Sequence, residues 1–264
     1  MSESIKELLS IRTAVGRWSG LGPYYAMFPR DFAFEVVETY SNPGDAVIDP
    51  FAGRASSIYA AVAMERHAYG FEINPVGWLY GFVKLHPAPE SDVLERIKNL
   101  GELSLYIQSQ ESSNLPEFFN FCYSSDVLRY LLTARRELMW KDNIVDATVM
   151  AIILVCLHGK RDSSLSNQMR QSKAMSPEYS IRWWQTNELD PPEIDPVKFL
   201  QNRAKWRYAK GLPRLSYGEM YLGDSTSLIN HLINRVNCSE LNKFSLLFTS
   251  PPYFAITNYY YDQW

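Results

Sequence analysis

The sequence predicts an α/β fold built on a mostly parallel sheet. The stretch VIDPFAGRASSIYAAVA, residues 47–63, reads as a strand, a tight loop of small residues and a helix, the order that opens a nucleotide-binding βαβ unit. A second apolar run, FSLLF at residues 244–248, leads into the prolines of TSPPY, residues 249–253. Because proline donates no backbone hydrogen bond, this strand is expected to end there, at the carboxyl edge where open α/β sheets bind ligands.

The loop after the first strand predicts a site for an adenosine moiety. A second strand, within AYGFEINP at residues 68–75, ends in Glu72, about 20 residues further on, the spacing at which such units hold ribose hydroxyls. The helix between the strands is expected to begin with Ser56 or Ser57 as its N-cap residue. The loop has one glycine, Gly53, and no Walker lysine, which argues against NAD and ATP.

Four motifs together resemble those of one enzyme family. They are DPFAG at residues 49–53, FEINP at 71–75, LGDS at 222–225 and TSPPY at 249–253. This set resembles the S-adenosylmethionine-dependent amino-methyltransferases of DNA, above all the subset whose target motif is SPPY. The resemblance implies a Rossmann-like methyltransferase sheet, S-adenosylmethionine as cofactor and double-stranded DNA as partner.

The resemblance also implies a donor site. In it, Asp49 and the following loop would cradle the methionine part, Glu72 would bind the ribose hydroxyls, and Asp224 would lie near the adenine. Phe28 belongs to a segment, residues 24–45, that resembles the cover over the methionine end. The implied donor-site residues are Phe28, Asp49, Pro50, Phe51, Ala52, Gly53, Glu72, Asn74 and Asp224. Ala55 stands where many relatives have a second loop glycine, and alanine adopts a positive φ only at a cost.

The target motif predicts how an exocyclic amine would be methylated. The amine lone pair is delocalised into the base ring, so hydrogen-bond acceptors must pull the nitrogen towards sp3 geometry. In the family these acceptors are a serine side chain and the carbonyl between the prolines, while the tyrosine stacks on the base. The residues that match are Ser250, Pro251, Pro252 and Tyr253. This is catalysis by positioning, and the stacking, about 1–3 kcal/mol, would offset much of the few kcal/mol that base extrusion costs.

Composition narrows the class of protein. With 264 residues, 46% of them hydrophobic, the chain can bury one sizeable core. It has no apolar run of about 18 residues and no signal-peptide pattern at its start, so a cytoplasmic protein without membrane contact is expected. Three cysteines without CxxC spacing and four dispersed histidines predict no disulfide framework, no metal site and no Pro-Cys nucleophile.

The charge distribution predicts a DNA-facing segment, although the net charge is −3. Residues 158–214 contain eleven Lys or Arg against six Asp or Glu, a net charge of +5, so the rest of the chain carries −8. Basic, polar and aromatic residues alternate there, which suits phosphate contacts and base stacking. The expected DNA contacts are Lys160, Arg161, Arg170, Lys173, Arg182 and Trp183. The alternative is a solvated basic loop whose tryptophans pack into the core.

The motif order predicts three regions. Residues 1–86 would form the N-terminal segment and the cofactor half, residues 87–214 a mostly helical insertion, and residues 215–264 the return to the sheet with the target motif. Helices are expected at residues 76–86, 91–108, 124–140, 144–158, 198–210 and 226–235. In the family three more strands normally follow the target strand, so the chain is expected to lack that C-terminal part and to pair with a second polypeptide.

The sequence leaves the substrate open. Serine before Pro-Pro-Tyr favours cytosine N4 over adenine N6, with a role in restriction–modification or phage defence. An RNA methyltransferase of the guanine-N2 type shares the fold and a PPY-type motif. A non-catalytic fragment of a split enzyme that binds cofactor or DNA is the third alternative.

Overall fold

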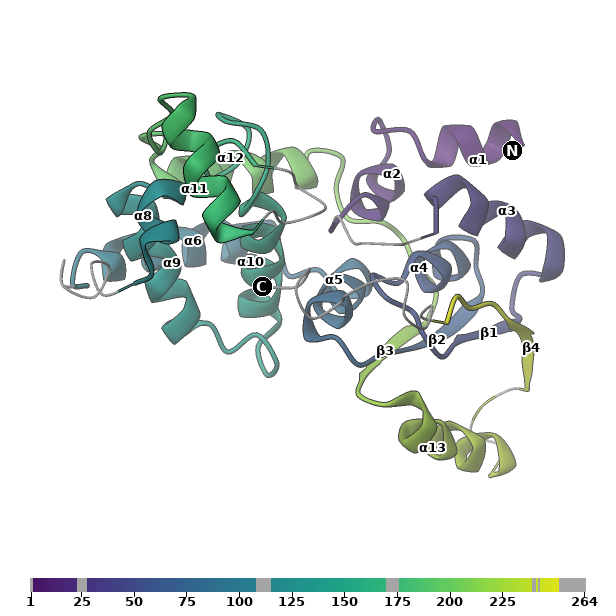
Figure 1. Cartoon of the computed structure of the whole chain (residues 1–264). Coiled ribbons are helices and arrows are strands. Elements are labelled where there is room, and N and C mark those ends of the chain that lie inside the picture. The colour runs from purple at the N-terminus through teal and green to yellow at the C-terminus, as the bar shows by residue number, and fades with distance from the viewer. Residues whose placement is uncertain are drawn as a thin grey trace. The chain divides into compact units, whose positions relative to one another are not determined.

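The computed structural model describes residues 2–22, 28–107, 115–169, 176–238, 241 and 243–251. Its described residues fall into two compact units (Figure 1). The first contains the chain up to Pro87 and again from Arg207, and the second contains Ala88–Trp206. The sheet lies in the first unit, and the second unit is helical.

The sheet of the first unit has four strands in the order β3-β2-β1-β4. The strands are β1 (Ala46–Asp49), β2 (His67–Glu72), β3 (Gly218–Leu222) and β4 (Phe244–Leu247). Each pairing is parallel, and the register between β1 and β4 shifts by one residue after Ala46. The predicted α/β fold with a mostly parallel, Rossmann-like sheet is therefore confirmed.

Helices cover both faces of this sheet (Figure 1). One face packs against α4 (Ser56–Ala63) and α5 (Pro75–Leu85), the other against α13 (Ser225–Asn237). On the α13 side, Leu232 packs with Ile48, Tyr69 and Phe71 of the strands. All four residues of β1 are buried, as expected for a parallel strand covered on both faces.

Three further helices precede the sheet in the first unit. They are α1 (Glu3–Leu8), α2 (Ala14–Ser19) and α3 (Arg30–Tyr40). Helix α3 packs against α4, and Trp18 of α2 makes an edge contact with Tyr208, whose ring centroid is 5.1 Å away. None of these helices was predicted from the sequence.

The helical unit contains α6 (Glu90–Ser104), α8 (Glu117–Cys122), α9 (Ser125–Glu137), α10 (Ile144–Cys156), α11 (Pro177–Thr186) and the start of α12 (Pro196–Tyr208). The six predicted helices correspond to α5, α6, α9, α10, α12 and α13, with ends that differ by up to four residues. The short helices α8 and α11 were missed. The functional assignment of the three sequence regions stays a prediction.

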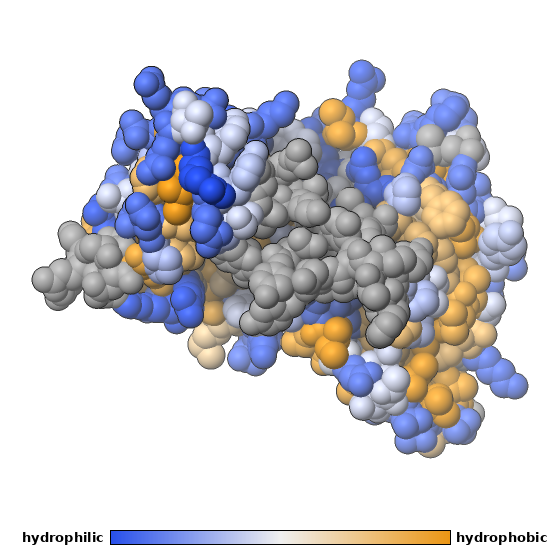
Figure 2. All heavy atoms as spheres, viewed as in Figure 1, coloured by the Kyte–Doolittle hydropathy of each residue, from blue (hydrophilic) through white to orange (hydrophobic). Residues whose placement is uncertain are grey.

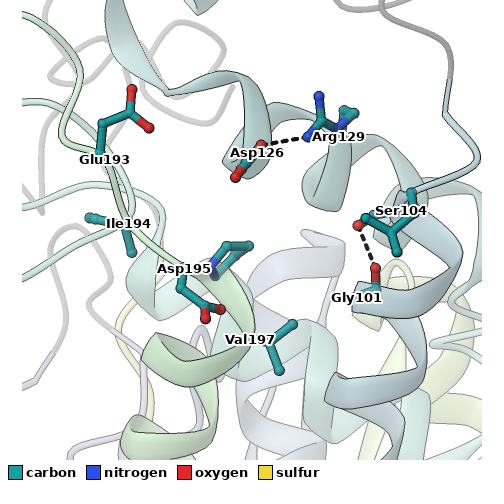
Figure 3. A pocket seen from close by; sticks show the side chains of 10 residues that line it. Gly101, Ser104, Asp126, Arg129, Glu193, Ile194, Asp195 and Val197 are labelled. Carbon is teal, nitrogen blue, oxygen red and sulfur yellow. Dashed lines mark hydrogen bonds and ion pairs between the residues drawn. The ribbon is translucent and has the colours of Figure 1, made fainter.

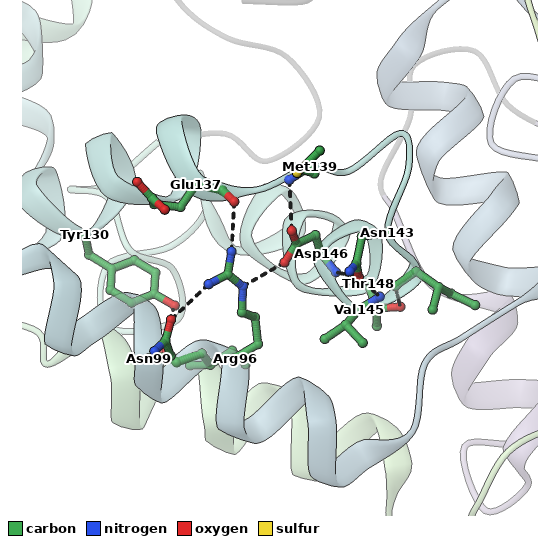
Figure 4. Close-up of polar contacts among 11 residues, drawn as sticks. Arg96, Asn99, Tyr130, Glu137, Met139, Asn143, Val145, Asp146 and Thr148 are labelled. Carbon is green, nitrogen blue, oxygen red and sulfur yellow. Dashed lines mark hydrogen bonds and ion pairs between the residues drawn. The ribbon is translucent and has the colours of Figure 1, made fainter.

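One ion pair organises the helical unit (Figure 4). Arg96 of α6 donates from Nε to Asp146 of α10 over 2.7 Å and from a terminal nitrogen to the carbonyl oxygen of Glu137 over 2.8 Å. Asp146 also accepts the backbone N–H of Met139 over 2.9 Å. The pair thus ties α6, the end of α9 and the start of α10 together.

Candidate functional site

The four strand ends of the sheet bring the sequence motifs to one edge. Because the strands are parallel, their carboxyl ends lie on the same side. Strands β1 and β2 end in Asp49 and Glu72, β3 leads through Gly223 to Asp224, and β4 leads through Thr249 to Ser250. The chain leaves β1 towards β2 on one side, whereas β4 lies on the other, so this edge is a topological switch point, the usual ligand site of such sheets.

Asp49 is the buried centre of this edge, with 1% of its surface exposed. Its Oδ1 accepts the backbone N–H of Phe51 over 3.0 Å and the hydroxyl of Thr249 over 2.6 Å. Its Oδ2 accepts the hydroxyl of Ser57. Burial raises the pKa of Asp49, and the hydrogen bonds from Ser57, Thr249 and Phe51 oppose that rise.

The loop after β1 differs from its prediction in one detail. The N-cap residue of α4 is Ala55, and no side chain caps the helix, so the prediction of Ser56 or Ser57 is wrong. Ser57 lies inside the helix and donates to Asp49 instead. Ala55 is fully buried with φ +62°, so alanine does occupy the left-handed region that the sequence marked as costly. The buried hydroxyl oxygen of Ser56 has no hydrogen-bond partner among the described residues.

Glu72 holds the same loop from the neighbouring strand. Its Oε2 accepts the backbone N–H of Gly53 and its Oε1 that of Asn74, each over 2.7 Å. Burial raises the pKa of Glu72, hydrogen bonds from the backbone of Asn74, Gly53 and Ile73 lower it, and the charge of Asp49 raises it. A Cβ at Gly77 would lie 3.1 Å from both Glu72 Cγ and the Gly53 carbonyl oxygen, so this glycine lets α5 approach the loop.

Asn74 and Asp224 both cap helices at this edge. Asn74 Oδ1 accepts the N–H groups of Val76 and Gly77 at the start of α5. Asp224 Oδ1 accepts the N–H and the hydroxyl of Thr226 over 2.8 Å each, which lowers the pKa of the Asp224 carboxyl. The strand end of β3 is joined to that of β2 because Gly223 N–H donates to the Glu72 carbonyl oxygen over 3.0 Å.

Aromatic and aliphatic side chains complete the edge. Phe28 stacks on Phe248, the last residue before Thr249, with ring centroids 4.7 Å apart. Phe51, in the loop, is 42% exposed, and Ile73, directly after Glu72, is 71% exposed. Sequence reasoning missed Ile73, although its place after the acidic strand end could have indicated it.

The target motif is described as far as Pro251. Ser250 is half-buried and Pro251 is exposed, while the other two predicted catalytic residues, Pro252 and Tyr253, lie outside the described residues. Sequence reasoning also missed the part that Thr249 takes in this site. Its place directly before Ser250 was the available signal.

Residues 3–76 match the family model described as DNA methylase. The N-terminal part of this chain is therefore similar to DNA methylases. The Type II methyltransferase M.MjaI of Methanocaldococcus jannaschii is 35% identical over 49 residues, 19% of this chain and 16% of that protein. The Type II methyltransferase M.MthZI of Methanothermobacter thermautotrophicus is 28% identical over 116 residues, 42% of this chain and 29% of that protein. No solved structure matches the chain.

These matches support a DNA methyltransferase, and with it a methyl donor of the S-adenosylmethionine type. The matched residues span less than a third of either relative. They leave the choice between cytosine N4 and adenine N6 open.

Four of the six DNA contacts predicted from the sequence lie among the described residues of the helical unit. Lys160 and Arg182 are exposed and Trp183 is half-buried. Arg161 donates to the carbonyl oxygen of Asp190 over 2.6 Å and to Asn167 over 3.2 Å, so its guanidinium already binds protein atoms. The two remaining predicted contacts, Arg170 and Lys173, lie outside the described residues. Trp184, next to Trp183, packs in the core with 1% exposure.

The helical unit also has a cavity of about 350 Å³ between α6, α9 and the connector before α12 (Figure 3). Its charged lining residues include Asp126, Arg129, Glu193 and Asp195. Asp126 pairs with Arg129 over 2.5 Å, and Asp195 pairs with Lys198 over 3.3 Å. Three of these four charged side chains therefore already form ion pairs within the protein. The sheet edge remains the candidate functional site.

Among the described residues, no group of three or more His, Cys, Asp or Glu side chains could hold a metal ion. No helix in this part of the chain has the length and apolar character needed to cross a membrane.

Proposed function

We propose that this chain transfers a methyl group from S-adenosylmethionine to the exocyclic amine of a flipped DNA base, cytosine N4 rather than adenine N6. The observation that carries the proposal is the convergence of Asp49, Glu72, Asp224 and Ser250 at one edge of the sheet. We also propose a role in restriction–modification or phage defence, which the similarity to two Type II methyltransferases supports.

The residues at this edge fit the proposed donor. Glu72 accepts the backbone N–H groups of Gly53 and Asn74, and a carboxylate, with roughly four lone-pair positions, can accept further hydrogen bonds, here from the ribose hydroxyls. Asp49 and Glu72 lie close enough for the charge of one to raise the pKa of the other, so a cationic ligand is favoured here. The unpartnered hydroxyl of Ser56, at the uncapped N-terminus of α4, suits a carboxylate oxygen. When bound, the donor supplies an electrophilic methyl group on a positively charged sulfur.

The remaining loop residues would shape the donor site. Pro50, Phe51, Ala52 and Gly53 connect β1 to α4, and the Ala52 N–H donates to the Phe71 carbonyl oxygen over 2.9 Å, which fixes the loop to β2. Phe51 and the rest of this loop would cradle the methionine part, and the exposed side chain of Ile73, directly after Glu72, would contact the adenine and exclude water from it. Phe28, packed on Phe248, would cover the methionine end.

The target motif would hold the base. Ser250 and the carbonyl oxygen of Pro251 would accept hydrogen bonds from the amine, and Tyr253 would stack on the ring beside Pro252. The amine nitrogen then forms a bond to the methyl carbon as the carbon–sulfur bond breaks, and the amine loses a proton to water. Lys160 and Arg182 would bind phosphates, together with Arg170, Lys173 and Arg161, and Trp183 would stack on a base.

A methyl-transfer assay tests the proposal. The purified protein is incubated with methyl-labelled S-adenosylmethionine and either mixed-sequence duplex DNA or bulk tRNA. The nucleic acid is then digested, and the labelled nucleosides are identified by mass spectrometry. We expect label in N4-methylcytosine. Label in N6-methyladenine would show that adenine, and not cytosine, is the methylated base. Label in tRNA would support the guanine-N2 alternative. Donor binding without methyl transfer would support a non-catalytic fragment.

We also propose that a second polypeptide pairs with β4. This strand is the last of the described sheet, and its burial alternates between half-buried and exposed residues. Apolar side chains gather on the surface around β4 and α13 (Figure 2). Leu247 of β4 is 62% exposed, and Ile233 of α13 is 46% exposed. An open, apolar strand edge favours pairing with another strand. A sharp cooperative melt of a monodisperse monomer by light scattering and calorimetry would contradict this proposal.

A further inference from the structure

One carboxylate joins the proposed donor loop to the proposed base-binding motif. Asp49 Oδ1 accepts from Phe51 N–H, in the loop, and from Thr249 Oγ1, directly before Ser250. Asp49 Oδ2 accepts from Ser57 of α4. Asp49 and Thr249 are 200 residues apart in the sequence, so one oxygen atom of Asp49 connects two distant segments of the chain.

The bond from Thr249 is a charge-assisted hydrogen bond in a buried place. Asp49 is 1% exposed and forms no ion pair with a cation of the described part. A buried carboxylate without a cation depends on its hydrogen-bond donors to replace water. Thr249 is one of three hydrogen-bond donors to this carboxylate among the described residues, and without it Oδ1 keeps the Phe51 N–H as its donor.

In the described part of the chain, Thr249 also makes the last hydrogen bond between the end of β4 and strand β1. Phe248 N–H donates to the Ile48 carbonyl oxygen over 3.1 Å. Beyond Phe248, the described contact that returns to β1 is the hydroxyl of Thr249 on Asp49. Pro251 has no N–H with which to extend the ladder. The position of Ser250 relative to the donor loop therefore depends on this hydroxyl.

From this geometry we infer that Thr249 is a positioning residue that couples donor binding to base binding through Asp49. The inference rests on the proposed function. Anything that orders the loop around Phe51 also orders Asp49, and through Thr249 it orders the start of the target motif. Thermodynamic linkage then requires that donor and DNA raise each other's affinity by the same factor.

Three variants test the inference in the full chain. Thr249→Val removes the hydroxyl and keeps the shape, Thr249→Ser keeps the hydroxyl, and Thr133→Val is the matched control. Thr133 is a buried threonine of the helical unit, 2% exposed, whose hydroxyl donates to the Arg129 carbonyl oxygen over 2.9 Å. For each variant we would measure kcat, the KM for S-adenosylmethionine, and the Kd for mixed-sequence duplex DNA with and without S-adenosylhomocysteine.

We expect Thr249→Val to lower kcat about tenfold or more, as for the loss of one hydrogen bond to a charged group. The factor by which S-adenosylhomocysteine tightens DNA binding should fall towards one, while the Kd for S-adenosylhomocysteine alone stays near the wild-type value. Thr249→Ser should restore both quantities, and Thr133→Val should change neither.

Two results would refute this inference and leave the proposed function standing. One is a wild-type kcat and coupling factor in Thr249→Val; the other is a parallel loss of thermal stability, donor affinity and kcat, which would make Thr249 a structural residue. If the wild-type chain binds S-adenosylhomocysteine or DNA but neither ligand affects the other, the coupling is also refuted. A wild-type chain that binds neither ligand refutes the proposed function and this inference with it.

Discussion

Glu72 offers the sharpest test of the donor site. Replacing Glu72 by Ala removes the carboxylate that accepts from Gly53 and Asn74 and that would accept from two ribose hydroxyls. Hydrogen bonds to a charged group contribute about 1.5–3 kcal/mol each, so two of them at the lower value amount to about 3 kcal/mol. The Kd for S-adenosylmethionine should therefore rise by a factor of about 150. Isothermal titration calorimetry measures this change directly.

The control must separate the site from general loss of structure. Glu219 lies on the adjacent strand β3, where it pairs with Arg235 over 3.4 Å and lies away from the carboxyl edge. Glu219→Ala should leave the Kd for the donor unchanged, and the melting temperatures of both variants show whether each is folded. A folded Glu72→Ala protein with wild-type donor affinity would refute the assignment of the ribose site.

Three further outcomes are expected. Tyr253→Ala should abolish most methyl transfer to DNA but keep the Kd for the donor in calorimetry, because its proposed partner is the base; an equal loss of both would remove it from the base site. Asp146→Ala should lower the urea-unfolding free energy by about 3 kcal/mol, because it leaves the guanidinium of Arg96, 23% exposed, without its carboxylate; a loss below about 1 kcal/mol would refute that role. Burial, followed by the charges of Arg54, Arg207 and Arg30, holds the pKa of Lys84 well below its ordinary 10.5. Between the lowered native pKa and 10.5, Lys84 is protonated in the unfolded state and neutral in the native state. The unfolding free energy should therefore increase with pH between these two values. Denaturant titrations of Lys84→Met should show a flatter pH dependence, and an identical slope would contradict the shift.

The sequence predicted the sheet edge well because its signals are local. Proline after an apolar run, a small-residue loop before a helix, and an acidic residue at a strand end each report on a few neighbouring residues. In a parallel sheet the carboxyl ends of the strands lie at one edge, which brings Asp49, Glu72 and Ser250 together. The six helices predicted from apolar periodicity are present in the structure, because that periodicity is also a property of neighbouring residues.

What the sequence missed depends on contacts between distant segments. Ser57 reads as an N-cap residue, yet the native structure gives its hydroxyl to the buried Asp49 and begins the helix after Ala55. Leaving Oδ2 of the buried Asp49 without the Ser57 hydroxyl would cost more than leaving the helix without a cap, about 1–3 kcal/mol or more for a charged group against about 1 kcal/mol. The short helices α2 and α8, six residues each, are too short for periodicity to indicate. Tertiary packing stabilises them.

The helical unit is inserted in the sequence between β2 and β3, and the sheet edge can form despite the length of this insertion. The unit enters the crossover between β2 and β3, two strands that pair over five residue positions from Ala68 to Glu72. Loop closure costs only about 0.6 kcal/mol for each doubling of length, so the crossover tolerates a long insertion provided that the insertion folds on its own core. The ends of the crossover are also fixed independently of it, by Gly223 N–H on the Glu72 carbonyl oxygen and by Trp78 Nε1 on the Met220 carbonyl oxygen over 2.9 Å. The residues of the carboxyl edge, Asp49, Glu72 and Asp224 among them, can therefore keep their positions while the inserted helices vary in length and sequence.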